Sequence, residues 1–310
     1  MKALQLTRYG GSEAMHVGQA DTPTIKSDEV LVEVHAASVN PVDTALREGY
    51  MKEMMPLQFP AILGADFAGV VREVGTEVTE LSVGDKVFGL ANLMRQGSFA
   101  ELLPVPAALI SPMPSLMEFQ EAAAVPLAGM NAWQALTKQA HLSAGQRILI
   151  HGGAGGIGSF AIQIAKHLGA TVITTVRKEH EQYARELGAD VVIDYEHKDF
   201  TTKVKDLDVV FDLVGGEAYK KSFALVKPGG IVVSMKERPD EKLAAHHGVT
   251  ALMQNTQREK TDLDALRQLI EAGHLKAHVD QIFPFDESAS ALPYQSTGHA
   301  RGKVVIKVRD

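Results

Sequence analysis

Five glycines lie close together in HGGAGGIGS, residues 151–159, and the stretch from Gly153 to Gly158 satisfies the spacing G-x-G-x-x-G. The apolar run RILIHG leads into it and the amphipathic run GSFAIQIAKHLG overlaps its end. In such a strand–turn–helix unit, the first glycine permits a sharp turn and the second lets a pyrophosphate approach the backbone. The third lets the helix pack close to the strand. The stretch therefore predicts a dinucleotide phosphate site, against the alternative of a tight turn that binds nothing.

The next strand-like run, TVITTV, includes Thr175 and is followed by Arg177 and Lys178. NAD-binding sites usually place Asp or Glu about 20 residues beyond the glycines, to hold the ribose 2′-hydroxyl. A guanidinium and an ammonium at this place instead attract a 2′-phosphate. We therefore predict NADPH as the cofactor. The alternative is that both charges are solvated residues in the first turn of the next helix.

The elements that must position these residues change in type along the chain. Residues 1 to 115 contain short, partly alternating β-branched runs broken by Gly, Pro and Asp, which indicates a β-rich domain. From residue 119, apolar strands alternate with helical stretches, which indicates a parallel sheet covered on both faces. We expect six strands in this sheet, at residues 147–152, 171–176, 190–195, 207–214, 230–235 and 248–253. A further helix, strand, short helix and strand follow residue 261.

Composition excludes several classes of function. The 310 residues carry a net charge of −7 with no dense run of Lys or Arg, which argues against nucleic acid or anionic membrane as a partner. The first residues, MKALQLTRYGG, look like a strand rather than a signal peptide, and no apolar run approaches the roughly 20 residues of a membrane helix. We expect a soluble, cytoplasmic protein. The chain has no cysteine, so disulfides, a Cys nucleophile and thiolate metal ligands are excluded.

Several segments, in order, resemble the zinc-independent quinone oxidoreductases (zeta-crystallin-like) of the medium-chain dehydrogenase/reductase superfamily. They are SVNPVDTALREGY, ILGADFAGVVREVGTEV, VGDKVFG, AAAVPLAGMNAWQAL, ILIHGGAGGIGSFAIQIAK, VVFDLVGGEAYKKSFALVKPGGIVVS and GHARGKVVIKV. The resemblance implies an α/β protein with a GroES-like β-rich catalytic domain and a Rossmann domain with a doubly wound, six-stranded parallel sheet. We place the catalytic domain at 1–118, completed by 266–310, and the NADP-binding Rossmann domain at 119–265. The resemblance also implies a homodimer.

The zinc alcohol dehydrogenases of the same superfamily have metal ligands at three positions that this chain fills differently. By resemblance, Cys is replaced by Asn40, His by Ala65, and the third ligand, a Cys, falls near Leu127. We expect no metal. Without one, the substrate must already be electrophilic, as a quinone or an α,β-unsaturated carbonyl is. Hydride transfer from the cofactor to such a substrate makes an anion that needs hydrogen-bond donors and a proton.

Asn40 and Tyr50 are the candidate catalytic residues, because the resemblance implies that both line the nicotinamide and substrate pocket. Tyr50 is expected to donate to the developing oxyanion, although water could supply the proton instead, and the alternative is a partly buried loop aromatic. Asn40-Pro41-Val42-Asp43 is also a good helix start, with Asn at the N-cap and Pro at the first position. Capping alone would explain these residues. If both roles hold, the backbone of Pro41, Val42 and Asp43 lies beside the nicotinamide.

The remaining cofactor contacts are assigned by matching positions in the family. Asn131 stands where relatives often have Thr, so its contact with the carboxamide of the nicotinamide is left open. Ligands of open α/β sheets bind where the strands end, which adds residues at the ends of the third, fourth and fifth strands. The full set of predicted cofactor-binding residues is Pro41, Val42, Asp43, Asn131, Gly153, Gly155, Gly156, Ile157, Gly158, Thr175, Arg177, Lys178, Tyr195, Val214, Gly215, Ser234 and Arg301.

The sequence thus favours an NADPH-dependent, zinc-independent reductase of quinones or α,β-unsaturated carbonyls. Two alternatives remain open at this point. One is a 2-enoyl-thioester reductase, which uses the same conjugate reduction but needs an acyl channel and a basic patch for the thioester carrier. The other is a non-catalytic protein that binds NADPH as a sensor or has a structural role.

Overall fold

The computed structural model describes residues 1–309, which form two compact units. The first comprises Met1–Leu127, Arg258–Glu271 and the chain from Ala277 onward; the second comprises Ala128–Gln257 and Ala272–Lys276. The expected domain boundary after residue 265 falls inside helix α8 (Lys260–Glu271), all of which belongs to the first unit. Within residues 1–309, no helix is both long and apolar enough to cross a membrane.

The first unit contains a seven-stranded sheet and a three-stranded sheet. The strand order of the larger sheet is β15-β16-β3-β5-β6-β8, and its seventh strand, β7, pairs with β3. The strand order of the smaller sheet is β2-β1-β4. Its strands are β1 (Lys2–Leu6), β2 (Met15–Gln19), β3 (Glu29–Val39), β4 (Ala61–Ile62), β5 (Asp66–Val74), β6 (Lys86–Leu90), β7 (Leu102–Pro106), β8 (Ile110–Pro112), β15 (Val279–Pro284) and β16 (Lys303–Lys307). Its helices are α1 (Pro41–Arg47), α2 (Phe119–Ala123), α8 and α9 (Ala291–Ser296). The β-rich expectation for this part of the chain is confirmed.

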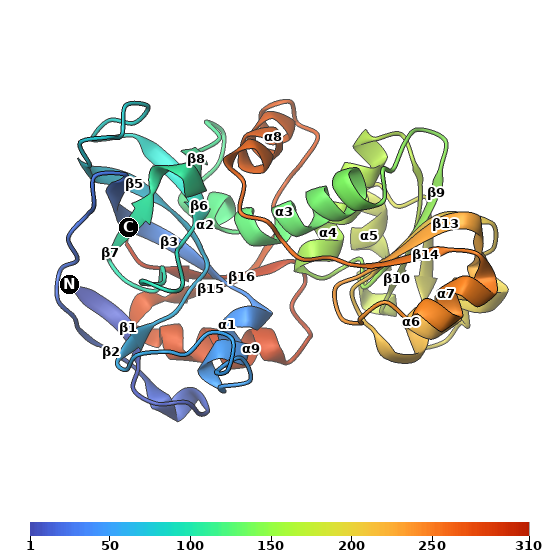
Figure 1. Cartoon of the computed structure of the whole chain (residues 1–310), viewed down its shortest axis with the longest axis horizontal. Helices are drawn as coiled ribbons and strands as arrows, with labels where there is room; N and C mark the ends of the chain where they lie inside the picture. Colours follow the sequence, from blue (N-terminus) through green and yellow to red (C-terminus); the bar gives the residue numbers. More distant parts are fainter. Residues whose placement is uncertain (310) are drawn as a thin grey trace. The chain divides into compact units, whose positions relative to one another are not determined.

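Strand β3 is the centre of the larger sheet. It pairs antiparallel with β5, β7 and β16, and ten of its eleven residues are buried, which explains why most positions of EVLVEVHAASV are apolar. The pairing with β16 joins Val39 to Val304 and brings the last strand of the chain, red in Figure 1, beside β3. The ends of β3, β5 and β16 therefore meet, although they are far apart in the sequence.

The second unit is a doubly wound parallel sheet with strand order β11-β10-β9-β12-β13-β14. Its strands are β9 (Arg147–His151), β10 (Thr171–Val176), β11 (Val191–Asp194), β12 (Leu207–Asp212), β13 (Val226–Ser234) and β14 (Thr250–Met253). All six match the expected strands. The helices are α3 (Pro126–Gln134), which begins in the first unit, α4 (Gly156–His167), α5 (Glu181–Glu186), α6 (Gly216–Ser222) and α7 (Glu241–His247).

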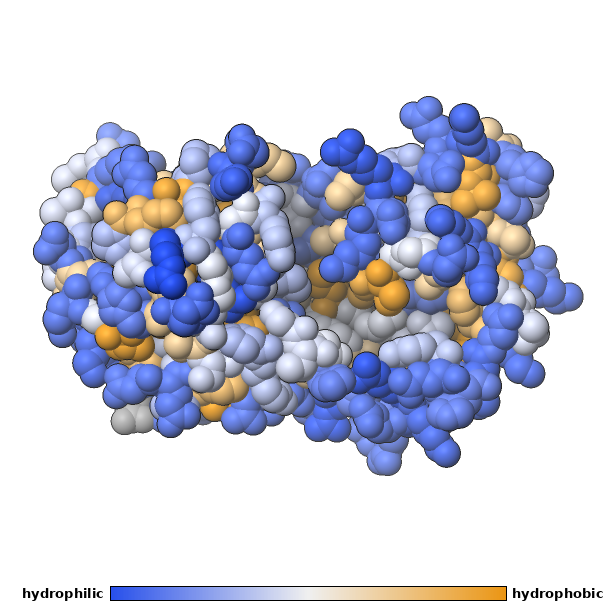
Figure 2. Space-filling view, turned by 90° about the horizontal axis from the view of Figure 1, so that it is seen from below, coloured by the Kyte–Doolittle hydropathy of each residue, from blue (hydrophilic) through white to orange (hydrophobic). Residues whose placement is uncertain are grey.

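Helices cover this sheet from both sides. Helix α4 packs against β9 and β10 and α5 against β10 and β11, whereas α6 and α7 pack against β12, β13 and β14 (Figure 1). The apolar residues of the strands are buried beneath them, with Leu149, Val210 and Val232 among the central ones. The face drawn in Figure 2 is mainly hydrophilic, with hydrophobic side chains in small separate areas. Burial of the apolar residues thus fixes the strand ends, at which the predicted cofactor residues lie.

Candidate functional site

The glycine-rich loop joins β9 to α4 in the second unit, and its sharp turn falls on Gly152. This residue has φ +74°, in the left-handed region that favours glycine. We expected Gly153 to make the turn; it lies within the turn of residues 152–154, but the residue with positive φ is Gly152. Gly153 is glycine for a different reason, because a Cβ there would lie 2.0 Å from Thr174 Oγ1 on β10.

The other two motif glycines differ in how much room surrounds them. A Cβ on Gly158 would lie 2.2 Å from the carbonyl oxygen of Gly152, so only glycine lets α4 start this close to the strand. A Cβ on Gly155 would meet only the carbonyl oxygen of Gly152, at 3.5 Å, which is ordinary contact. The protein itself therefore does not require glycine at 155. A ligand that approached this backbone closely would require glycine there, which is the role expected for the second glycine of the motif.

Helix α4 begins without a side-chain cap. Gly155 is its N-cap residue, no side-chain hydrogen bond caps it, and the first turn contains no acid. The first N–H groups of a helix have no partner inside the helix and lie at its positive end. Gly156, Ile157 and Gly158 occupy that first turn, so the loop has the donors and the space that a pyrophosphate requires.

A buried histidine, His151, lies directly before the glycine-rich loop and is hydrogen-bonded on both ring nitrogens. His151 ends β9, and its ring nitrogens lie 3.0 Å from Thr175 Oγ1 and 2.9 Å from Ser222 Oγ. Burial lowers its pKa, so the ring is neutral. The carbonyl oxygen of Thr175 accepts the N–H groups of Gly152 and Gly153, at 3.1 and 3.2 Å. Thr175, a predicted cofactor residue, is buried, and its side chain faces His151 and the loop backbone.

The cations that predicted the 2′-phosphate lie at the end of β10. Arg177 Nε donates to Tyr195 Oη at 3.1 Å and lies 3.6 Å from Glu196 Oε1. Lys178 begins a short 3₁₀ helix directly after Arg177. The structure thus brings Arg177 and Tyr195 together from the ends of two neighbouring strands, and Tyr195 is half exposed. Glu196 places a carboxylate next to the same guanidinium.

At the ends of β12 and β13, a buried aspartate organises the loops. Asp212 Oδ1 accepts the N–H groups of Val214 and Gly215, and its Oδ2 accepts the Ser234 hydroxyl at 2.7 Å. Ser234 Oγ in turn accepts the N–H groups of Lys236 and Glu237. Ser234 is fully buried, so its hydroxyl shapes the backbone of the loops, whereas Val214 is exposed.

Asn131 lies on α3 and is buried. Its Oδ1 accepts a hydrogen bond from the hydroxyl of Thr256 in the same unit. The oxygen of the side-chain amide is therefore engaged within the protein.

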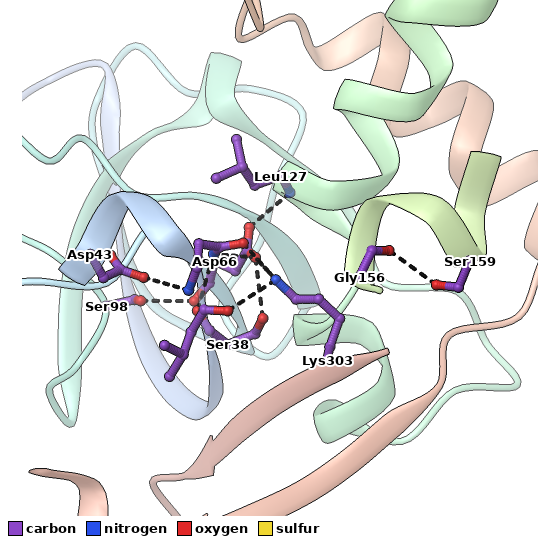
Figure 3. A network of polar contacts seen from close by, with 10 residues as sticks. Ser38, Asp43, Asp66, Ser98, Leu127, Gly156, Ser159 and Lys303 are labelled. Atoms are coloured by element: carbon purple, nitrogen blue, oxygen red, sulfur yellow. Dashed lines mark hydrogen bonds and ion pairs between the residues drawn. The ribbon is translucent and has the colours of Figure 1, made fainter. Parts of the chain in front are cut away.

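In the first unit, a buried ion pair joins the ends of β5 and β16. Asp66, at the start of β5, is fully buried, and Lys303, at the start of β16, is nearly so. Asp66 Oδ1 accepts the N–H of Leu127 at 2.8 Å (Figure 3). Its Oδ2 accepts from Ser38 Oγ, Asn40 Nδ2 and Lys303 Nζ, at 3.2, 2.8 and 3.3 Å. These four donors come from three segments of the chain, because Ser38 and Asn40 lie two residues apart.

Asn40 is the N-cap residue of α1, as predicted, and Pro41 is its first residue. The backbone N–H of Asn40 donates to Asp43 Oδ2 at 2.8 Å, which satisfies the backbone at the helix start. The Asn40 carboxamide is directed to Asp66, to Lys303 and to the carbonyl oxygen of Ser38. Both of its N–H groups are therefore used within the protein. Val42 is half-buried in α1 between an exposed Pro41 and a buried Asp43.

Tyr50 follows α1 and is 79% exposed. A hydrogen bond with Glu48 raises the pKa of the Tyr50 hydroxyl, because the carboxylate disfavours a second negative charge. The hydroxyl is therefore protonated at neutral pH, and its proton is donated to the Glu48 carboxylate. Arg301, also exposed, donates through Nε to His278 Nε2 at 3.0 Å.

The three positions that hold zinc ligands in the zinc alcohol dehydrogenases meet at Asp66. Ala65 precedes it, Asn40 donates to its Oδ2, and Leu127 donates to its Oδ1. Neither Ala65 nor Leu127 has a side chain that binds a metal, and the Asn40 amide oxygen accepts from Lys303. Among residues 1–309, one other group, Asp194, Glu196 and His197, has metal-binding atoms close together. His197 Nδ1 lies 2.7 Å from the Asp194 carboxylate, and we assign no metal to this group.

Sequence reasoning missed Ser38, Asp66, His151, Asp212 and Lys303. Each of the last four gave a signal, because it is a polar or charged residue at the first or last position of a strand, directly beside a run of apolar residues. That signal marks a buried partner but does not name it. The Asp66–Lys303 pair, for example, forms only when β3, β5 and β16 lie side by side.

Comparison with known proteins agrees with this architecture. A family profile described as "Alcohol dehydrogenase GroES-like domain" matches residues 26–115, and one described as "Zinc-binding dehydrogenase" matches residues 187–306. The chain is 37% identical to the NADPH-dependent alkenal/one oxidoreductase, chloroplastic, of Arabidopsis thaliana, over 99% of this chain and 79% of the relative. It has the same identity and coverage with the 2-methylene-furan-3-one reductase of Solanum lycopersicum.

The chain belongs to the medium-chain dehydrogenase/reductase superfamily. The solved quinone oxidoreductase of Coxiella burnetii superposes with a TM-score of 0.93 and 34% identity, and the alignment covers 100% of this chain and 99% of that protein. The resemblance to the quinone oxidoreductase branch of this superfamily is confirmed, as is the combination of a GroES-like part with a six-stranded Rossmann sheet. Although one matching profile is named for zinc binding, this chain lacks thiolate ligands altogether.

Proposed function

We propose that this chain is an NADPH-dependent reductase that reduces quinones or α,β-unsaturated carbonyls by hydride transfer, without zinc. The observation that carries the proposal is the loop from Gly152 to Gly158, in which the protein leaves room at Gly155 that a bound pyrophosphate would use. Close relatives that cover the whole chain are named for the same chemistry, as an alkenal/one oxidoreductase and a quinone oxidoreductase.

The residues present in the second unit fit NADPH. The uncapped first turn of α4 offers N–H donors to the pyrophosphate, with no acid in that turn to repel it. Arg177 and Lys178 offer positive charge to a 2′-phosphate, and Tyr195 adds a hydroxyl beside Arg177. When bound, NADPH supplies the hydride, and the protein positions it. We propose the other predicted contacts, from Val214, Gly215 and Arg301, on the same basis.

The first unit supplies groups for the oxygen that becomes negative. Hydride addition to an enone leaves an enolate, and reduction of a quinone leaves a hydroquinone anion, so each oxygen needs a donor and then a proton. Tyr50 carries a protonated, exposed hydroxyl that would donate to this oxygen by exchanging its bond with Glu48 for one with the substrate, and water can replace it as the proton source. Asn40 cannot donate as it stands, because both of its side-chain N–H groups are used. We propose that Asn40 holds the start of α1 instead.

The test is NADPH oxidation by the purified protein across a panel of quinones, short enones, alkenals and enoyl thioesters, with loss of NADPH absorbance as the readout. We expect turnover with quinones or short enones and a lower KM for NADPH than for NADH. A preference for long enoyl thioesters would favour a 2-enoyl-thioester reductase. Tight NADPH binding without any turnover would favour a non-catalytic sensor or structural protein. A lower KM for NADH would contradict the role given to Arg177 and Lys178.

We also propose a homodimer and a cytoplasmic location. Strand β14 is an outer strand of the six-stranded sheet, and an outer strand leaves backbone groups on which a second copy can pair. Light scattering of the purified protein tests the dimer, since a monomeric mass would contradict it. Cell fractionation tests the location, and recovery in an organelle or membrane fraction would contradict it.

A further inference from the structure

Lys303 is a buried ammonium whose hydrogen bonds are all made to protein groups. The residue is 4% exposed, and Nζ donates to Asn40 Oδ1 at 2.5 Å, to the carbonyl oxygen of Val39 at 3.2 Å and to Asp66 Oδ2 at 3.3 Å. An ammonium has three N–H donors, so none is left over. The side chain points to these protein partners and acts on them (Figure 3).

The two charges determine which way the Asn40 carboxamide faces. An ammonium can only donate and a carboxylate can only accept, so the amide oxygen must face Lys303 and the amide nitrogen must face Asp66. The observed bonds follow this pattern, with Asn40 Nδ2 at 2.8 Å from Asp66 Oδ2 and 3.3 Å from the Ser38 carbonyl oxygen. A flipped amide would set donor against donor and acceptor against acceptor.

A buried ion pair is not explained by stability. Taking two charges out of water costs about as much as their attraction returns, and replacing both by uncharged groups of similar size is often neutral or stabilising. Here the pair joins β16 to β5 and holds the residue that begins α1. Its effect is to specify one geometry for Asn40.

That geometry extends along α1 to Tyr50. The Asn40 N–H is held by Asp43, Asp43 N–H donates to the Asn40 carbonyl oxygen, and the N–H of Tyr50 donates to the carbonyl oxygen of Ala45 in the same helix. A shift of Asn40 would therefore move the start of the helix to whose last turn the backbone of Tyr50 is bonded.

We propose that Lys303, together with Asp66, is a positioning residue that locks the Asn40 carboxamide and thereby the start of α1. This inference rests on the proposed reductase function, in which Tyr50 lies at the end of the segment so positioned. It assigns a role to a side chain on the last strand, Lys303, which the sequence analysis did not name as a site residue.

The decisive variant removes both charges, K303M/D66N, because K303M alone would leave Asp66 as an unpaired buried anion and could fail to fold. We expect the double variant to remain folded and to keep its Kd for NADPH, while kcat with the best electrophile of the panel falls about tenfold or more. K303R, which keeps the charge, should retain more activity than K303M/D66N. A matched control, K2M/D286N, removes an exposed ion pair of the same unit and should leave kcat unchanged.

A second measurement does not depend on turnover. In the wild-type protein, the side-chain amide protons of Asn40 should give one ordered pair of NMR signals that exchange slowly with solvent. In K303M/D66N the pair should shift and exchange faster, while backbone amides of β3 and β5 stay protected. If wild-type protein reduces nothing in the panel, the proposed function fails, and this signal alone decides the positioning role. Unchanged Asn40 signals, or an unchanged kcat in an active, folded double variant, would overturn the inference.

Discussion

Two carboxylates of the first unit, Asp43 and Asp66, are both fully buried but are partnered very differently. Asp66 accepts four hydrogen bonds, one of them from an ammonium. Asp43 accepts the Asn40 N–H through Oδ2, while its Oδ1 has no hydrogen-bond partner. Burial raises the pKa of Asp43 to about 7. A carboxyl group in this position titrates near neutral pH, because only part of its lost hydration is replaced.

This difference predicts a pH dependence of stability that D43N should remove. The folded-state pKa of about 7 lies above the ordinary value of 3.8, so the folded protein binds the proton more tightly. The free energy of unfolding contributed by Asp43 is therefore greatest below pH 3.8 and falls as the pH rises toward 7. Asn at this position is neutral and can still accept the Asn40 N–H. Urea unfolding at about pH 5 and about pH 9 should show D43N gaining stability relative to wild type at the higher pH. A constant difference would mean that Asp43 keeps its ordinary pKa.

Tyr50 gives the second prediction at the residue scale. Its hydroxyl stays protonated because Glu48 raises its pKa, so Y50F removes a donor without removing a charge. We expect kcat/KM for the electrophile to fall about tenfold, or ~1.4 kcal/mol, which is modest because water can reach this exposed site. The matched control is Y294F, which removes a hydroxyl bonded to Asp280 in the same unit. Equal effects of the two variants would leave Tyr50 without a catalytic role.

At the scale of elements, the β9–α4 loop shows that glycines of one motif serve different purposes. Gly152 makes the turn through its positive φ, and Gly153 and Gly158 let the backbone approach Thr174 and Gly152. Gly155 has no such constraint within the protein. Backbone conformation and packing within the protein therefore explain the glycines at 152, 153 and 158. The glycine at 155 is explained by the ligand that we expect there.

The loop predicts that two alanine substitutions have opposite signatures. G155A should fold with a melting temperature close to wild type, because its φ is negative and its Cβ makes only ordinary contact, but it should bind NADPH about tenfold more weakly or worse. G158A should lower the melting temperature, because its Cβ would overlap the Gly152 carbonyl oxygen. Thermal unfolding and NADPH titration of both variants separate the two effects. Wild-type affinity in G155A would mean that no pyrophosphate approaches this residue.

At the scale of the whole molecule, the first unit contains both the first 127 residues and the chain from Ala277 onward. Strand β16 lies between β15 and β3, and its Val304, Val305 and Ile306 are buried. It also carries Lys303 to Asp66. The first unit thus depends on residues from both ends of the sequence, whereas most of the second unit is continuous.

Removal of residues 303–310 should therefore unfold most of the first unit. The three buried aliphatic side chains contribute about 5–9 kcal/mol together, comparable with the roughly 5–15 kcal/mol by which a domain is stable. Limited proteolysis should cleave within β1 to β8 in the truncated chain but not in the intact one. Removal of residue 310 alone is the control. If the truncated chain resists proteolysis, β16 is dispensable for the first unit.

Periodicity in the sequence was enough to predict all six strands of the parallel sheet and the helix after the glycines. These features depend on neighbours in the sequence, such as the apolar run before Gly152 and the amphipathic run after Gly155. The positions of β15 and β16 were not predictable in this way, because strand order in a mixed sheet depends on pairings between distant segments.

The candidate site likewise combines features that the local sequence predicts with features that depend on contacts between distant segments. Residue types and spacing alone predicted the phosphate loop, the cations at 177 and 178 and the lack of thiolate ligands. Only the tertiary structure placed the turn on Gly152, engaged both N–H groups of Asn40, and joined Lys303 to Asp66 across 237 positions of the chain. The reason is that a motif records the local backbone conformation and the charges near it. A buried polar group is satisfied by whichever partner the folded sheet brings within hydrogen-bond distance.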